Sequence, residues 1–160
     1  PDFSAIVDAT IQLRDRYFPS AKISVLSNAT MLERKEVFEA LKKVDNPILK
    51  LDSAIDATAH IINKPCGNYS VANVVEQLHE FGREFVLQTM FLRSEEFTTV
   101  SEEALSSWIE IVKELKPRQV MVYTIDRETP DKSLKKYTVE EMTGFVRPLQ
   151  EAGFDVKISG

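Results

Sequence analysis

The chain has 160 residues, of which 43% are hydrophobic and 28% are charged, and its formal net charge is -5. This length and composition are typical of one globular domain that buries its own core. The acidic balance argues against a general nucleic-acid-binding surface, although it leaves room for a small basic pocket. No apolar run approaches the ~20 residues that span a bilayer. The single cysteine, Cys66, excludes an internal disulfide and favours a reducing, cytoplasmic location.

Hydrophobic spacing and turn residues predict helices and strands that alternate along the chain. The predicted helices cover residues 3–18, 33–44, 54–62, 70–81, 101–115 and 138–153. The predicted strands cover residues 22–26, 48–51, 84–92, 119–125 and 154–159.

Three of the predicted helices begin with residues that favour helix capping. Ser70 and Ser101 each precede an apolar stripe, and two glutamates after Ser101 suit the positive end of the helix dipole. Thr138 and Glu141 have the spacing of a capping box.

Regular alternation of strands and helices predicts an α/β fold with a parallel sheet and helical crossovers. The loop lengths permit either an open doubly wound sheet or part of a (β/α) barrel, and the pattern does not choose between them. In both architectures the functional site forms at the carboxyl ends of the strands, because the strand-to-helix loops gather there.

Polar residues lie in or after four predicted strands and would converge on one mouth. They are Ser27, Asn28, Asp52, Gln88, Thr89, Arg93, Tyr123, Thr124 and Arg127. Such a mouth suits a polar small molecule with hydroxyl, amine and carboxylate groups.

Each of these side chains has a structural interpretation beside the functional one. Asp52 can accept hydrogen bonds from ribose hydroxyls or an ammonium, Asn28 can bind a carboxylate or carbonyl, and Arg93 or Arg127 can pair with an anion. Asp, Ser, Thr and Asn are also the preferred helix caps, so Asp52 could cap a helix as well. An amide such as that of Gln88, inside a buried strand, must find a partner in the backbone or in a ligand.

Other candidates for chemistry are weaker. Cys66 has no sequence-adjacent base that would activate its thiol. His60 and His79 lie in predicted helices without a second ligand at metal-binding spacing. The sequence contains no Gly-rich phosphate loop, Ser-His-Asp order or zinc signature. The charged run at 126–137 is typical of a solvated loop, although a basic loop beside a barrel mouth could also contact an anionic substrate.

Four segments, in their order and spacing, resemble the radical S-adenosylmethionine (SAM) superfamily. The most similar branch is that of the iron-sulfur oxidoreductases related to the archaeal wyosine-base tRNA synthetases. The segments are ISVLSNAT at 23–30, ILKLDSAIDATAHIINKP at 48–65, FVLQTMFLRS at 85–94 and VMVYTIDRETP at 120–130.

The resemblance implies an α/β partial parallel barrel in which residues 1–160 form a single domain with strands three to six of a (β/α)6 barrel. Such enzymes bind a [4Fe-4S] cluster through C-x-x-x-C-x-x-C and cleave SAM reductively to a 5′-deoxyadenosyl radical. The chain has one cysteine and no Gly-Glu-Pro stretch. The cluster-binding segment is therefore expected upstream of Pro1, where Pro1-Asp2-Phe3 resembles a family segment, and the chain alone is expected to be inactive.

Position by position, the resemblance assigns the lining of the cofactor site. The residues are Ser27, Asn28, Asp52, Gln88, Thr89, Tyr123 and Thr124. Ser94 departs from the glycine that this branch often has. The relatives leave the substrate open between a modified RNA base and a protein. The strand at 22–26 would be an unpaired sheet edge, which favours self-association.

Two other interpretations remain open at this level. The chain can be a complete small α/β domain, flavodoxin-like or barrel-like, that binds a polar or phosphorylated small molecule and uses non-radical chemistry. It can also be a non-catalytic interaction domain.

Overall fold

A computed structural model describes residues 2–160, so Pro1 and its resemblance to a family segment lie outside the described residues. The helices are α1 (Phe3–Tyr17), α2 (Lys35–Lys43), α3 (Asp56–Asn63), α4 (Val71–Phe81), α5 (Glu102–Leu115) and α6 (Val139–Glu151). The strands are β1 (Ser24–Ser27), β2 (Asn46–Lys50), β3 (Val86–Met90), β4 (Leu92–Arg93), β5 (Gln119–Tyr123), β6 (Lys135–Lys136) and β7 (Val156–Ser159).

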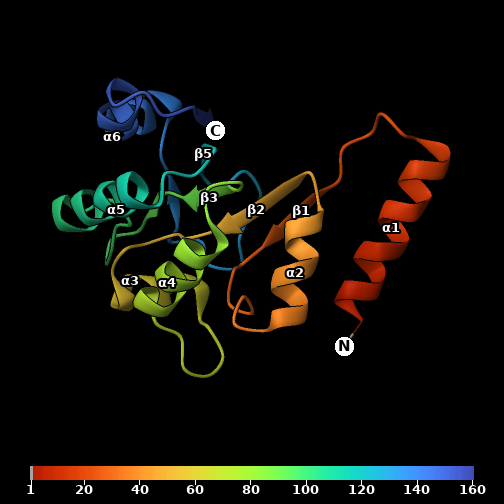
Figure 1. Cartoon of the computed structure of the whole chain (residues 1–160). Coiled ribbons are helices and arrows are strands. Elements are labelled where there is room, and N and C mark those ends of the chain that lie inside the picture. Colours follow the sequence, from red (N-terminus) through yellow and green to blue (C-terminus); the bar gives the residue numbers. More distant parts are fainter. Residues whose placement is uncertain (1) are drawn as a thin grey trace.

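Five strands form one parallel sheet in the order β1-β2-β3-β5-β7, and Figure 1 shows the helices around it. Each new long strand is added on the same side of the previous one. A doubly wound sheet would reverse this order at a switch point, whereas a barrel does not. Because strand–helix–strand crossovers are right-handed, steady addition in one direction places the crossover helices on one face. The winding is therefore of the barrel type.

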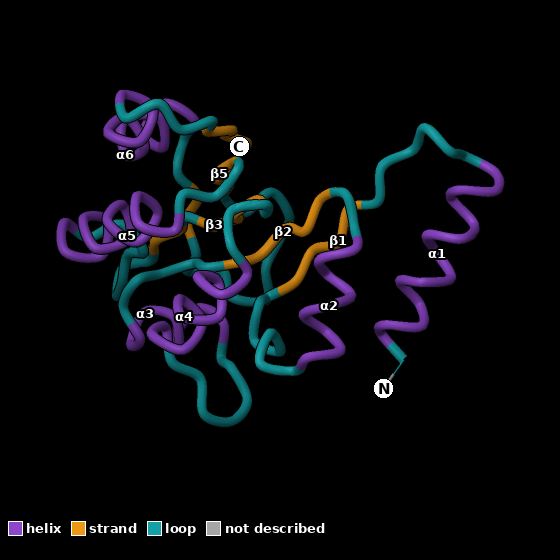
Figure 2. Tube along the Cα trace, viewed as in Figure 1, coloured by secondary structure: helices purple, strands orange, loops and turns teal. Residues whose placement is uncertain are grey.

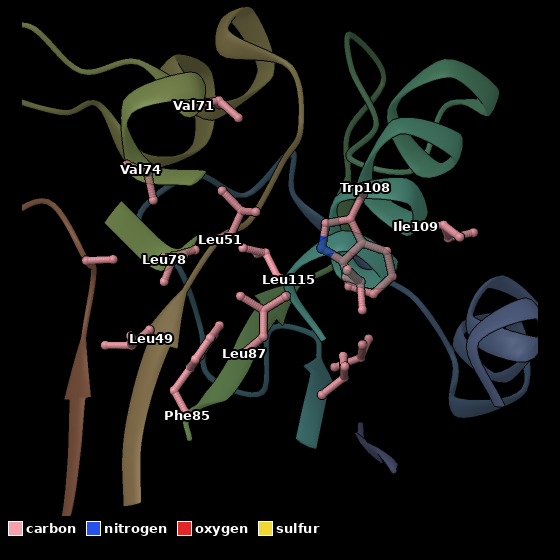
Figure 3. Packing of buried hydrophobic residues seen from close by; sticks show 14 of the residues in the cluster. Leu49, Leu51, Val71, Val74, Leu78, Phe85, Leu87, Trp108, Ile109 and Leu115 are labelled. Atoms are coloured by element: carbon pink, nitrogen blue, oxygen red, sulfur yellow. The ribbon is translucent and has the colours of Figure 1, made fainter. Parts of the chain in front are cut away.

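The core lies between this sheet and its helices, as Figure 3 shows. Alternate strand residues point toward the helices. Leu49 of β2 and Leu87 of β3 are fully buried and belong to the same cluster as Leu78 of α4 and Trp108 of α5. The opposite sheet face has no helix layer among the described residues, and it holds the half-buried side chains of the same strands.

The predicted helix caps are confirmed. The hydroxyl of Ser70 accepts a hydrogen bond from the backbone N–H of Asn73, and that of Ser101 accepts one from Ala104. Thr138 and Glu141 form the complete capping box that their spacing predicts.

The third predicted strand is shorter than expected. It ends at Met90, and Leu92–Arg93 then pairs antiparallel with Lys135–Lys136 of the charged loop. The backbone N–H of Leu92 donates to the hydroxyl of Thr99, and Thr99 returns a hydrogen bond to the Leu92 carbonyl. The chain thus leaves the parallel sheet after β3 and pairs with β6 instead. This pairing joins segments that lie far apart in the sequence.

Helix α1 lies beyond the β1 edge of the sheet, and Figure 2 shows it joined to β1 by a long loop. Its Val7 packs with Ala40 of α2 and Val44. No strand among residues 2–160 pairs with the outer side of β1, and Leu26 of that strand is 64% exposed. The described structure therefore has an open sheet edge there.

The carboxylate of Asp45 ties the loop after α1 to the sheet. It accepts hydrogen bonds from the backbone N–H of Ile23 at 3.0 Å, from Lys22 at 3.0 Å and from Arg14 at 2.8 Å. The backbone hydrogen bond from Ile23, followed by that from Lys22, holds the pKa of Asp45 well below its ordinary value.

We expect Asp45→Asn to lower the melting temperature at pH 7, because the charged partner of Arg14 and Lys22 is lost. A depressed folded-state pKa contributes stability above the unfolded value of about 4, and this contribution declines as the pH falls toward the folded value. The difference in melting temperature between the parent and Asp45→Asn should therefore shrink steadily below about pH 4. Thermal unfolding followed by circular dichroism at several pH values measures it, and a gap that widens in acid would contradict the assignment.

None of the helices in residues 2–160 is both long enough and apolar enough to cross a membrane.

Candidate functional site

The open face of the sheet carries a row of polar side chains near the carboxyl ends of three strands. Strand pairing places Lys50 beside Gln88, and two residues further along it places Met90 beside Tyr123. These residues alternate with the core-facing ones, so they point away from the helices. Asp52 follows Lys50 by two positions and therefore continues the same row, which we call the open-face row.

Asp52 is the most buried member of the open-face row, with a side-chain exposure of 0%. Its Oδ1 accepts a hydrogen bond from the backbone N–H of Met90 at 3.0 Å. Its Oδ2 lies 2.8 Å from the ammonium of Lys50, but the two are not aligned as a hydrogen bond. Among residues 2–160, the Lys50 ammonium is therefore the charged neighbour of this buried oxygen, and its alignment is poor. A buried carboxylate oxygen accepts more than one hydrogen bond, so a ligand can supply a further donor.

Asp52 does not cap α3. The capping position of that helix is Ile55, which makes no side-chain capping bond. The backbone N–H of Ile55 instead donates a hydrogen bond to the hydroxyl of Ser53 at 3.0 Å. The carboxylate of Asp52 is directed to β3 and Lys50, so the helix-cap interpretation is wrong for this residue.

Lys50 links Asp52 to its surroundings. Its ammonium lies 3.4 Å from the side-chain oxygen of Asn63. Burial lowers the pKa of Lys50, but Asp52 and then Tyr123 raise it, and the net value lies above that of a free lysine. Burial, together with Asp52, raises the pKa of Tyr123 against the influence of Lys50. At neutral pH, Lys50 is a cation and Tyr123 is a neutral phenol that can donate a hydrogen bond.

Thr89 and Thr124 lie on the opposite, helix-covered face. The hydroxyl of Thr89 donates to the Leu51 carbonyl at 2.8 Å and accepts from the indole N–H of Trp108 at 3.1 Å. The hydroxyl of Thr124 donates to the Phe91 carbonyl and accepts from the backbone N–H of Tyr137. Successive strand residues face opposite ways, so the structure separates these two threonines from Gln88 and Tyr123.

Ser27, the last residue of β1, and Asn28 begin the turn that follows this strand. The Ser27 hydroxyl accepts from the backbone N–H of Ala29, and the Asn28 side-chain oxygen accepts from both the N–H and the hydroxyl of Thr30. These are the local bonds that such residues make in turns. Asn28 also lines a cavity, so it combines a turn role with an accessible carboxamide.

The two arginines proposed as anion partners, Arg93 and Arg127, differ in whether the guanidinium already has a partner in the protein. Arg93 donates to Glu141 at 2.9 Å, and its guanidinium lies 4.3 Å from the centre of the Tyr137 ring. Arg93 therefore fastens β4 to the start of α6, which is a structural alternative to the ligand contact considered above. Arg127 is exposed in the charged loop.

The sequence did not reveal a cavity of about 860 Å³ beside Lys50, which we call the side cavity. It lies between the β1–α2 loop on one side and the α3–α4 loop with the first turns of α4 on the other. Its lining includes Asn28, Ala29, Glu33, Lys50, Asn63, Lys64, Cys66, Asn68, Tyr69, Ser70, Asn73 and Gln77. Three asparagines in and beside the α3–α4 loop, Asn63, Asn68 and Asn73, were a sequence signal, but asparagine is also favoured in and next to turns for conformational reasons.

The remaining candidates are spread over the surface. Cys66 is exposed at the side cavity, and His79 faces Glu114 of α5 at 2.9 Å. Within residues 2–160, no group of three or more His, Cys, Asp and Glu side chains is arranged to hold a metal ion.

Solved structures with similar folds include SuiB of Streptococcus suis bound to S-adenosylmethionine. The match covers 98% of this chain and 36% of that one, with a TM-score of 0.71 and 15% sequence identity. A radical SAM methyltransferase from Sphaerobacter thermophilus matches 95% of this chain and 46% of its own, with a TM-score of 0.70 and 13% identity. A domain of the pyruvate-formate lyase-activating enzyme of Bacteroides vulgatus matches 100% of this chain and 95% of its own, with a TM-score of 0.67 and 14% identity.

Sequence relatives include two UPF0026 proteins, whose name states no activity. The protein of Methanocaldococcus jannaschii is 27% identical over 135 residues, which are 82% of this chain and 40% of that protein. The protein of Synechocystis is 28% identical over 116 residues, 70% of this chain and 41% of that protein. The chain thus matches about two fifths of the length of these relatives.

No protein-family model matches the chain. The structural matches, together with the five parallel strands and their winding, confirm the predicted fold class: an α/β partial barrel shared with radical SAM enzymes.

Proposed function

We propose that this chain is the part of a radical SAM enzyme that binds SAM along the carboxyl ends of its strands. The observation that carries the proposal is the buried Oδ2 of Asp52, whose neighbour Lys50 is poorly aligned as a hydrogen-bond donor, within a fold that resembles a SAM-bound protein. SAM offers ribose hydroxyls and an ammonium, which are donors that this oxygen can accept beside Lys50.

The rest of the open-face row fits the same ligand. Gln88 and Tyr123 are half-buried and present an amide and a neutral phenol, which can hydrogen-bond the edge of a purine. Lys50 holds the Asp52 carboxylate in position. Bound SAM would supply the radical chemistry, and the role of this chain's residues would be to bind the cofactor, orient it and exclude water.

The described residues do not fit an iron-sulfur cluster. They contain no suitable group of ligands, and Cys66 is the sole cysteine of the sequence. We propose that the ligands of a cluster belong to another part of a longer protein, in which β1, β2, β3 and β5 of this chain supply strands three to six of the barrel and β7 adds a fifth parallel strand.

The reaction class, the branch of the superfamily, the location and the substrate rest on the sequence resemblance. The resemblance supports an oxidoreductase of the branch related to wyosine-base tRNA synthetases. It also supports a cytoplasmic location and a modified RNA base or a protein as the substrate. One structural neighbour, SuiB, is bound to the precursor peptide SuiA, which adds support for a protein substrate. The open edge of β1 supports self-association of the isolated chain.

Asp52→Asn should weaken SAM binding by about tenfold or more, because a charged acceptor contributes more than a neutral one. Isothermal titration of the purified chain with SAM measures this. Asp8→Asn is the matched control, since Asp8 is an exposed carboxylate of α1 whose ion pair with Lys43 lies away from the strand ends. Equal SAM affinity in the parent and in Asp52→Asn would overturn the proposed site.

The purified 160-residue chain should be colourless and should show no reductive cleavage of SAM. The physical reason is the lack of a cluster-binding group of residues in the described chain. Absorbance, iron analysis and chromatography of the products test this expectation. A brown protein with stoichiometric iron and sulfide would refute the proposal that the cluster ligands lie outside these 160 residues.

A further inference from the structure

We propose that the side cavity binds a second ligand, an uncharged molecule with an amide-type edge, and that it is the substrate pocket of the SAM-dependent reaction. The role as a substrate pocket rests on the proposed function, whereas the binding chemistry follows from the cavity itself.

The side cavity adjoins the proposed SAM site through one residue. Lys50 lines the cavity, and its ammonium lies 2.8 Å from Oδ2 of Asp52 and 3.4 Å from Asn63 at the end of α3. A ligand in this cavity would therefore lie next to the open-face row. With a volume of about 860 Å³, the cavity is within the size range of small-molecule sites.

Carboxamides dominate the chemistry of the side cavity. Four of the five asparagines of the chain line it, and Gln77 adds a fifth carboxamide; the five are Asn28, Asn63, Asn68, Asn73 and Gln77. The side chains of Asn68, Asn73 and Gln77 form no hydrogen bond with another residue in 2–160. Asn73 and Gln77 lie four residues apart on one face of α4, so they lie beside each other.

The charges around the side cavity largely compensate each other. Its lining holds Glu33, Lys50 and Lys64, and Asp52 balances Lys50. The remaining pair, Glu33 and Lys64, has opposite signs. A neutral site of this kind selects by hydrogen-bond pattern more than by charge, which favours an uncharged ligand.

A carboxamide offers one acceptor and two donors in a plane. It forms two parallel hydrogen bonds with a partner that presents a donor beside an acceptor, as Asn and Gln do with adenine. The half-buried ring of Tyr69 contacts His60 edge-on at 5.7 Å between ring centres and adds an aromatic surface to the lining. The fitting ligand therefore has a flat body and an amide-type edge.

The wall opposite α4 is held in an unusual conformation. Ala29 is buried and has a φ of 62°, in the left-handed region that residues other than glycine rarely adopt. The hydroxyl of Ser27 accepts a hydrogen bond from the backbone N–H of Ala29. The backbone N–H and the hydroxyl of Thr30 both donate to the side-chain oxygen of Asn28. Backbone strain of this kind tends to occur at functional sites, and here the two hydrogen bonds from Thr30 fix the position of the neighbouring Asn28 carboxamide.

Three fragments of equal size test the ligand class: benzamide, benzoate and benzylamine, which carry a neutral amide, an anion and a cation. Each is titrated into the isotope-labelled 160-residue chain while the side-chain NH2 signals are followed by nuclear magnetic resonance. We expect benzamide to shift the signals of Asn73 and Gln77 saturably at millimolar concentration, with weaker effects from the other two.

The variant Asn73→Ala/Gln77→Ala should bind benzamide about tenfold more weakly, because two hydrogen bonds are lost. Gln150→Ala on α6 removes a carboxamide from a helix that does not line the cavity, and it should leave binding unchanged. The near-isosteric Asn73→Asp/Gln77→Glu should reverse the preference toward benzylamine.

Stronger binding of benzoate, or no saturable binding of any fragment, would overturn the proposal. SAM titration separates this outcome from the proposed function. If SAM binds through Asp52 and benzamide does not bind, the amide pocket fails alone. If benzamide binds and SAM does not, the amide-binding site stands and its role as a substrate pocket fails.

Discussion

Lys50→Met should lower the free energy of unfolding by about 3 kcal/mol, because it leaves the carboxylate of Asp52 buried without its cation. This value lies at the low end of the range for breaking a buried ion pair, since the Lys50 side chain retains 25% exposure. Urea unfolding followed by circular dichroism measures the change.

The double variant Lys50→Met/Asp52→Asn provides the control. A neutral amide at position 52 can still accept from the N–H of Met90, and it needs no cation. Most of the lost stability should therefore return. A double variant that is as unstable as Lys50→Met alone would show that the lysine stabilises the fold through packing of its alkyl chain and not through its charge.

Trp108→Ala should cost about 3–5 kcal/mol, because it opens a large cavity at the junction of α5 and the sheet. Trp108 is 2% exposed, contacts Phe91 edge-on and donates to the hydroxyl of Thr89. Such a loss is a large fraction of the stability of a typical domain. Since Trp108 is the single tryptophan, far-ultraviolet circular dichroism is the appropriate measurement.

Two further substitutions separate packing from hydrogen bonding at this position. Trp108→Phe keeps most of the apolar contact and should cost much less than Trp108→Ala, because the Thr89 hydroxyl still donates to Leu51. Ile61→Ala removes an exposed apolar side chain and should change stability by about 0.5 kcal/mol or less. Equal losses for Trp108→Phe and Trp108→Ala would show that the indole hydrogen bond dominates.

The local pattern of residues was sufficient for the element types, the helix caps and the class of fold. Ser70, Ser101 and the Thr138–Glu141 pair act on backbone groups within four residues of themselves, so neighbouring sequence determines these caps. Alternation of helices and strands likewise predicted a parallel sheet. The short pairing of β4 with β6 was missed, because its two strands are some forty residues apart and have no periodic signal.

The candidate site was predicted in part. The sequence alone placed polar residues at the strand ends, because connections in parallel sheets gather there. Which of them share a face depended on where each strand begins and on its register. Gln88 and Thr89 are neighbours in the sequence, yet one belongs to the open-face row and the other bonds to Trp108 behind the sheet.

The sequence by itself determined the six helices within residues 2–160, the five strands of the parallel sheet there, the capping and the α/β class of this protein, since these depend mainly on interactions over a few residues. Only the tertiary structure decided the barrel winding, the pairing of Lys50 with Asp52 and the gathering of four asparagines around one cavity. The physical reason is distance along the chain: strand order, burial of a charge and the shape of a cavity are properties of segments that meet through folding. A linear pattern records the chemistry of each segment but not the neighbours that it acquires.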